Sequence, residues 1–101
     1  MALDIHKSDN NEYICGIDEK HYNCLHIIFE EFKNSTGIEI DQYGDTSLDI
    51  ENIKLLIKLI NNYIEKTDLN KNKKETSMIL EFKGLLNMFL ENNTSIKFIG
   101  D

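Results

Sequence analysis

The side chains best suited to chemistry in this 101-residue chain lie in one stretch, TGIEIDQYGDTSLD, residues 36–49. It holds four carboxylates and a tyrosine, with no lysine among them. These side chains are Glu39, Asp41, Tyr43, Asp45 and Asp49. Such a loop can bind a metal ion, supply paired carboxylates to a catalytic site, or present an acidic surface to a basic partner. It can also be a plain connection in which Asp49 caps the following helix.

A calcium-binding loop of the EF-hand type does not fit this stretch. Counted from Asp41, the third, fifth, sixth and twelfth positions are Tyr43, Asp45, Thr46 and Asn52. An EF-hand requires a carboxylate or amide, a carboxylate, a glycine and a bidentate glutamate there, so three of the four fail. We therefore expect no metal and no other cofactor. The oxygen-rich composition keeps a small metal- or ligand-binding regulatory domain as the alternative function.

Two cysteines and two histidines suggest a zinc site or a catalytic pair. Cys15, His21, Cys24 and His26 are spaced C-x5-H-x2-C-x-H, without the paired C-x2-C or H-x3-H elements of structural zinc sites. His21 or His26 could act as a base near Cys24, but no nucleophile elbow, phosphate loop or oxyanion motif accompanies them. We expect free, half-buried thiols and no enzyme.

The charge is strongly negative and unevenly distributed. The net charge is -7, from eighteen acids and eleven lysines, and the chain has no arginine. A negative chain without the arginine fork is a poor ligand for phosphates, so we expect neither a nucleic-acid nor a membrane partner. Residues 1–51 hold twelve of the acids and three of the lysines. This half is either a solvated face that keeps the protein soluble or a surface that steers a basic protein partner.

The chain has the length of one small domain, residues 1–101. It begins with no charged-then-apolar signal pattern, and no apolar run approaches the roughly 18 residues of a membrane helix. A cytoplasmic location is expected.

Short apolar runs at residues 2–6 and 12–17 predict a β-hairpin. Asp18 is placed as a helix N-cap, and Gly37 suits the left-handed residue that ends that helix. The apolar stripe between them consists of Tyr22, Leu25, Ile28, Phe29 and Phe32.

The alternation of Ile38 and Ile40 with acids predicts a short strand before the loop. Two further helices, capped by Asp49 and Asn72, are expected to form an antiparallel hairpin, and Gly84 in the second indicates a close packing contact. Residues 95–100 are expected to add a strand to the sheet. The predicted fold class is α+β, with a small, mostly antiparallel sheet packed on about three α-helices.

Residues 29–49, FEEFKNSTGIEIDQYGDTSLD, preceded by LDI at 3–5 and ICGID at 14–18, carry a resemblance to a known family. The chain resembles the small cytoplasmic immunity proteins of bacterial contact-dependent growth inhibition and related polymorphic toxin systems. The resemblance implies a non-enzymatic inhibitor that binds the C-terminal toxin domain delivered by a neighbouring cell. Such toxins are frequently nucleases with basic clefts, and we expect a ribonuclease first.

These immunity proteins share no universal motif, so the contact residues are assigned from charge and loop position. Carboxylates in the first half would take the places of substrate phosphates in the toxin's cleft. The predicted toxin-binding residues are Asp18, Glu19, Glu30, Glu31, Glu39, Asp41, Tyr43 and Asp45.

Overall fold

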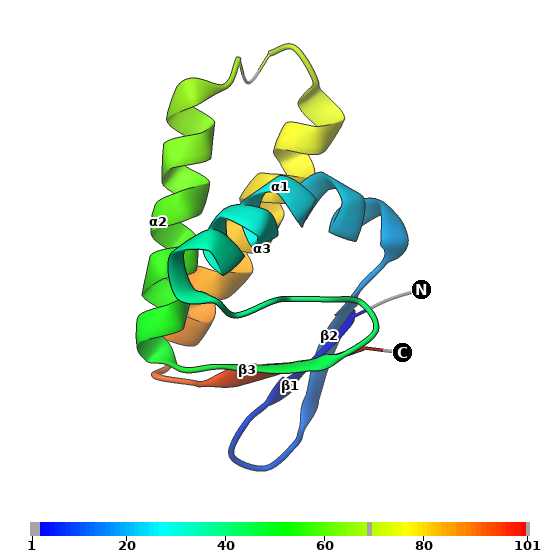
Figure 1. The fold of residues 1–101 in the computed structure, drawn as a ribbon, viewed down its shortest axis with the longest axis vertical. Helices are drawn as coiled ribbons and strands as arrows, with labels where there is room; N and C mark the ends of the chain where they lie inside the picture. Colours follow the sequence, from blue (N-terminus) through cyan, green and yellow to red (C-terminus); the bar gives the residue numbers. More distant parts are fainter. Residues whose placement is uncertain (1–2, 69, 101) are drawn as a thin grey trace.

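The structure, a computed structural model, describes residues 3–68 and 70–100 (Figure 1). Four strands and three helices follow in the order β1 (Leu3–Lys7), β2 (Tyr13–Ile17), α1 (Glu19–Thr36), β3 (Asp45–Leu48), α2 (Ile50–Lys66), α3 (Lys73–Glu91) and β4 (Ile96–Ile99). The predicted α+β class is confirmed, as are the N-terminal hairpin and the C-terminal strand. Ala2, which the sequence placed in the first strand, lies outside the described residues.

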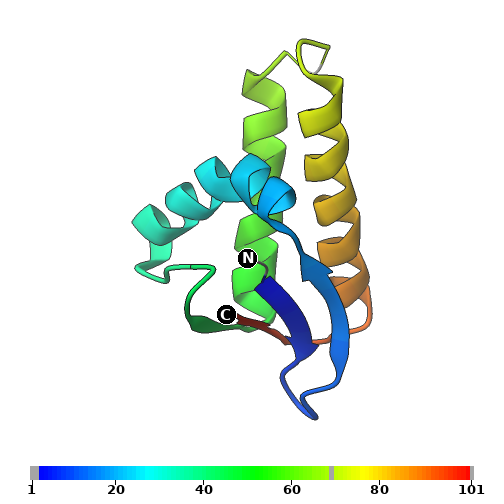
Figure 2. The ribbon, with the colours of Figure 1, turned by 90° about the vertical axis from the view of Figure 1, so that its right-hand side faces the viewer.

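The four strands form one antiparallel sheet in the order β2-β1-β4-β3. The helices lie on one side of the sheet, and α2 and α3 form the expected antiparallel hairpin (Figures 1 and 2). Leu3 and Ile5 of β1 and Phe98 of β4 are fully buried, so the helix-facing side of the sheet is the floor of the core. In this order, β2 and β3 are the two edge strands of the sheet.

The three helices begin at the predicted N-cap residues, and α1 ends at the predicted glycine. Asp18 accepts a hydrogen bond from the backbone N–H of His21, and Asp49 accepts one from Asn52. Gly37 has φ 78° and donates its N–H to the carbonyl of Lys33, as expected for a left-handed C-terminal residue. These caps satisfy backbone groups that a helix end leaves without intrahelical partners.

The core draws on every strand and helix. The apolar stripe of α1 is buried as predicted. Phe29 within it makes an edge-to-face contact with Phe82 of α3 and a tilted contact with Phe98 of β4, at ring-centroid distances of 5.9 and 6.3 Å. Burial of each large apolar side chain contributes about 1.5–3 kcal/mol. The aromatic contacts fix α1 across both the sheet and the helical hairpin.

The strand predicted at Ile38 and Ile40 is wrong, because these residues form an irregular segment. Ile40 is 3% exposed and enters the core from the loop, while its carbonyl accepts a hydrogen bond from the Tyr22 hydroxyl. The strand lies later, at Asp45–Leu48, where it pairs with Ile96–Ile99. The alternation of apolar and acidic residues at 38–41 therefore comes from a loop that buries Ile40 in the core, and not from a strand.

The close packing predicted at Gly84 is also wrong. This glycine is exposed, and a Cβ built on it would meet no atom within 4 Å. The absence of a side chain at this position leaves open space beside α3. No helix within residues 3–68 and 70–100 is long and apolar enough to cross a membrane.

Candidate functional site

The acidic loop after α1 turns back beneath that helix (Figure 1). Hydrogen bonds join it to the elements on both sides. The Tyr22 hydroxyl donates to the Ile40 carbonyl at 3.2 Å, and the Thr46 hydroxyl donates to the Glu39 carbonyl at 2.9 Å. The first bond joins the loop to α1, and the second joins it to β3. The loop backbone is therefore held between a helix and an edge strand.

Three of the predicted carboxylates lie within electrostatic reach of the Tyr22 hydroxyl. Burial raises the pKa of Tyr22, and the negative charges of Asp41, Glu30 and Glu39 raise it further, because each disfavours a second negative charge nearby. Glu30 comes from α1, and the other two come from the loop. The fold has brought together charges from separate parts of the sequence.

Few cations balance these three charges. Lys33 lies 3.6 Å from Glu39, and His26 lies 3.4 Å from Glu30. Asp41 accepts the backbone N–H of Tyr43, and no cation of the described residues pairs with it. Exposed ion pairs contribute only about 0–1 kcal/mol, so a cationic partner can displace Lys33 from Glu39.

Tyr43 stands beside this group and is 63% exposed. A tyrosine supplies a large contact area at low conformational cost and is enriched where proteins bind one another. We call Glu30, Glu39, Asp41 and Tyr43 the acidic surface. Asp45 follows in the chain at the start of β3, where its register with Ile99 places it on the sheet face away from the helices.

The remaining predicted residues lie elsewhere. Glu31 is turned about 100° around α1 from Glu30, and it is not among the charges that act on Tyr22. Asp18 is the N-cap of α1 and Glu19 lies in its first turn, about 16–18 Å along the helix axis from Glu30. The eight predicted residues therefore divide into the acidic surface, its neighbour Asp45, and three outlying carboxylates.

The cysteine and histidine residues do not converge. His21 bonds to Asp18 at 2.6 Å, His26 pairs with Glu30, and the Cys24 thiol contacts the Met78 sulfur at 3.4 Å. Within the described ranges, no group of three or more His, Cys, Asp or Glu side chains is arranged to hold a metal ion.

Both thiols are free and half-buried, as the sequence indicated. Burial raises the pKa of Cys15, and burial followed by the charge of Glu75 raises the pKa of Cys24. Since the thiolate is the nucleophile, the fold disfavours the reactive form of both residues.

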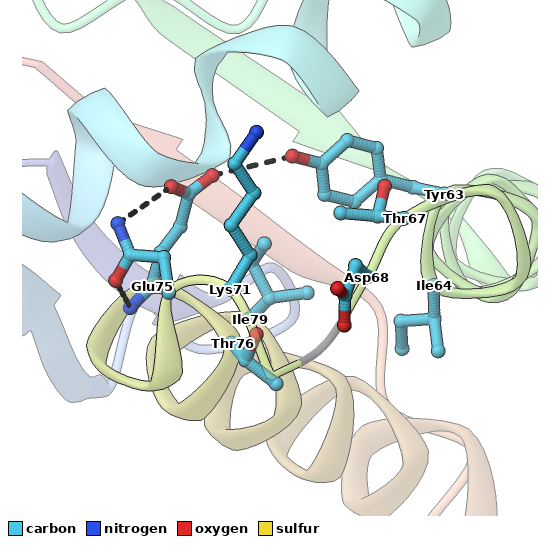
Figure 3. Close-up of a pocket in the computed structure, with 9 residues that line it drawn as sticks. Tyr63, Ile64, Thr67, Asp68, Lys71, Glu75, Thr76 and Ile79 are labelled. Carbon is cyan, nitrogen blue, oxygen red and sulfur yellow. Dashed lines mark hydrogen bonds between the residues drawn. The ribbon is translucent and has the colours of Figure 1, made fainter.

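A pocket of about 320 Å³ opens at the tip of the α2–α3 hairpin (Figure 3). Its central acid, Glu75, accepts a hydrogen bond from the Tyr63 hydroxyl at 3.2 Å and one from the Asn72 side chain at 3.4 Å. Burial and then the charge of Glu75 raise the pKa of Tyr63. Glu75 thus joins the two helices through side-chain hydrogen bonds at the pocket.

A larger groove of about 820 Å³ lies between β2, the first turn of α1 and α3, and we call it the β2–α3 groove. Its lining consists of Asp4, Tyr13, Cys15, Gly16, Ile17, Asp18, His21, Leu25, Met78, Glu81, Phe82, Gly84, Leu85 and Met88. Sequence reasoning missed it because its two walls are separated by most of the chain. A glycine in the middle of an amphipathic helix was the available signal, and it was interpreted as tight packing.

Comparisons of the chain with protein-family models, with curated proteins and with solved structures find no match.

Proposed function

We propose that this chain is an immunity protein, a non-enzymatic inhibitor that binds a cognate toxin domain of the contact-dependent growth inhibition type in the cytoplasm. The observation that carries the proposal is the acidic surface, where Glu30, Glu39 and Asp41 all act electrostatically on Tyr22 and the exposed ring of Tyr43 lies next to Asp41. The resemblance described above supplies the class of partner. The toxin is proposed to be a nuclease, and a ribonuclease in the first instance.

Binding would replace weak internal ion pairs by stronger intermolecular ones. A nuclease cleft carries lysines and arginines that hold substrate phosphates, and carboxylates can occupy the same positions through charge-assisted hydrogen bonds. Glu39 would exchange Lys33 for a toxin cation, and Asp41, which pairs with no cation among the described residues, would gain one. Tyr43 would contribute apolar contact at the centre.

The uneven charge of the chain supports a basic partner. Long-range attraction by the acid-rich first half would accelerate encounter with a cationic cleft, and salt would screen it. The absence of arginine is consistent with a protein that mimics a polyanion rather than binding one.

The deciding experiment is co-expression of this chain in bacteria with the toxin domain encoded beside it. We expect the cells to survive and the two proteins to co-purify. Death of the cells with full-length chain present, or survival without a complex, would contradict the proposal.

A matched pair of variants tests the surface. Glu30→Gln, Glu39→Gln and Asp41→Asn together remove three charges, yet each amide keeps a hydrogen-bond acceptor, so the loop turn is retained. The control removes three exposed charges elsewhere through Asp9→Asn, Glu65→Gln and Glu91→Gln. We expect the first variant to bind the toxin roughly 100-fold more weakly, from loss of charge-assisted hydrogen bonds, and the control to bind within a few-fold of the parent chain.

A further inference from the structure

The outer edge of β2 is open. β2 is the terminal strand of the sheet, so its backbone N–H and C=O groups on one side have no strand partner within the described residues. Edge strands are usually protected by lysine, proline, a bulge in the strand or extreme shortness. The sequence of β2, YICGI, contains neither lysine nor proline. Its register with β1 skips Ile14, so β2 has one bulge at that residue, and residues 15–17 are paired regularly.

The β2–α3 groove continues this open edge as an apolar channel. Ile17, Leu25 and Phe82 form a buried floor, while Tyr13 and Met88 are 57% and 44% exposed at its margins. Gly84 borders the groove from α3, and the space beside its Cα is empty. An extended segment placed along β2 would find backbone partners on one side and apolar surface on the other.

The rim of the groove is acidic. Asp4, Asp18 and Glu81 line it, and no lysine is among its lining residues. Such a rim attracts cationic side chains and repels anionic ones. A second copy of this chain is disfavoured as occupant, because pairing β2 with β2 would bring the same carboxylates of two molecules, each of net charge -7, toward one another.

We propose that the β2–α3 groove binds an extended, basic segment of a partner protein, which adds to the sheet as a fifth strand beside β2. Alternate side chains of the segment face the apolar floor, and its lysines or arginines reach the carboxylates of the rim. The proposal goes beyond the proposed function, since it concerns a surface remote from Glu39 and Asp41 and does not require the partner to be a toxin.

The test uses a short synthetic peptide in which lysine and valine alternate, titrated into the isotope-labelled chain and followed by backbone amide NMR. We expect shifts in β2 and in residues 78–88, weakened by added salt. A peptide with glutamate in place of lysine should not bind. A peptide N-methylated at alternate residues should also fail, because it cannot complete the ladder of backbone hydrogen bonds.

Two variants of Gly84 distinguish an effect on peptide binding in the groove from an effect on folding. Gly84→Leu places a side chain in the empty space and should weaken peptide binding roughly tenfold or more, since a filled pocket loses its ligand contacts. Gly84→Ala removes the same helix-weakening glycine but adds one methyl group, and should bind within a few-fold of the parent chain. Unchanged circular dichroism and melting would show that both variants remain folded.

Shifts confined to residues 30–45 would overturn the groove proposal while leaving the acidic surface as the binding site. Equal binding of the lysine and glutamate peptides, or no binding of either, would also overturn it. A dimer that forms without peptide in sedimentation experiments and is lost in Gly84→Leu would identify a second copy as the occupant, contrary to the proposal.

Discussion

The two edges of the sheet are built in opposite ways. β3 is four residues long and polar, it exposes Asp45 and Ser47, and the loop before it is bonded to Thr46. β2 is five residues long and mostly apolar, and it borders an open groove. A short, charged edge resists strand addition, whereas an apolar edge invites it. The comparison indicates that the fold presents charged side chains near the β3 edge and unpaired backbone groups at the β2 edge.

The largest effect on stability is expected at Ile40, which holds the acidic loop before β3 in the core. Ile40→Ala removes a core side chain that is 3% exposed and fixes the acidic loop, so the free energy of unfolding should fall by about 2–5 kcal/mol. Ile38→Ala, at a half-buried position nearby, should lower the free energy of unfolding by clearly less. Urea denaturation measures both. Equal small losses would show that the loop is not fixed through Ile40.

Gly100→Ala tests how closely the chain packs beside β3. A Cβ at Gly100 would lie 2.6 Å from the carbonyl oxygen of Gln42 and from the nitrogen of Gly44, and backbone atoms cannot move aside cheaply. The expected destabilisation is about 1–3 kcal/mol. Gly44→Ala is the matched control, because a Cβ there meets nothing within 4 Å. Similar melting temperatures for the two variants would contradict the close approach.

On the β2 side, a substitution of glycine by alanine should increase the stability of the protein instead of decreasing it. Gly84→Ala adds a methyl group in open space within α3, so the better helix former should raise the free energy of unfolding by about 1 kcal/mol. Thermal melting followed by circular dichroism checks this. A loss of stability would mean that α3 packs against β2 and that no groove exists.

The smallest expected effect concerns the ionisation of Tyr22. Its folded-state pKa is raised, so the fold favours the protonated phenol. This contribution to stability is complete below the unfolded pKa of about 10 and is lost as pH rises through the folded value. In the Glu30→Gln, Glu39→Gln, Asp41→Asn variant the pKa of Tyr22 should fall only part of the way, because burial, the larger cause, remains.

NMR titration of the tyrosine ring carbons measures this shift. Tyr63 is the internal control, since its raised pKa derives from burial and Glu75 and should not change in the variant. An unchanged pKa at Tyr22 would show that the three carboxylates do not meet around it.

Much of the fold was predictable because it depends on local signals. Asp18, Asp49 and Asn72 cap the three helices as expected, and the apolar spacing of α1 identified its buried face. β3 was missed because DTSL has no local strand signal. It is a strand only because Ile96–Ile99, far along the chain, pairs with it.

The candidate site was only partly predictable for the same reason. Charge and loop position selected Glu30, Glu39 and Asp41, which do meet, but they also selected Asp18 and Glu31, which lie apart. Sequence reports how many charges a region holds, whereas helix rotation and chain reversal decide which of them share a surface. The β2–α3 groove depends wholly on contacts between distant segments, which no local pattern contains.

The place of β4 between β1 and β3 determines when the molecule can be completed during synthesis. The hairpin and the helices can begin to form as they leave the ribosome, but β3 must wait for a partner strand made almost half the chain later. Pairing across such a separation is slow compared with local folding. On the proposed function, a new chain would therefore begin to protect the cell only after β4 has been made and has paired with β3.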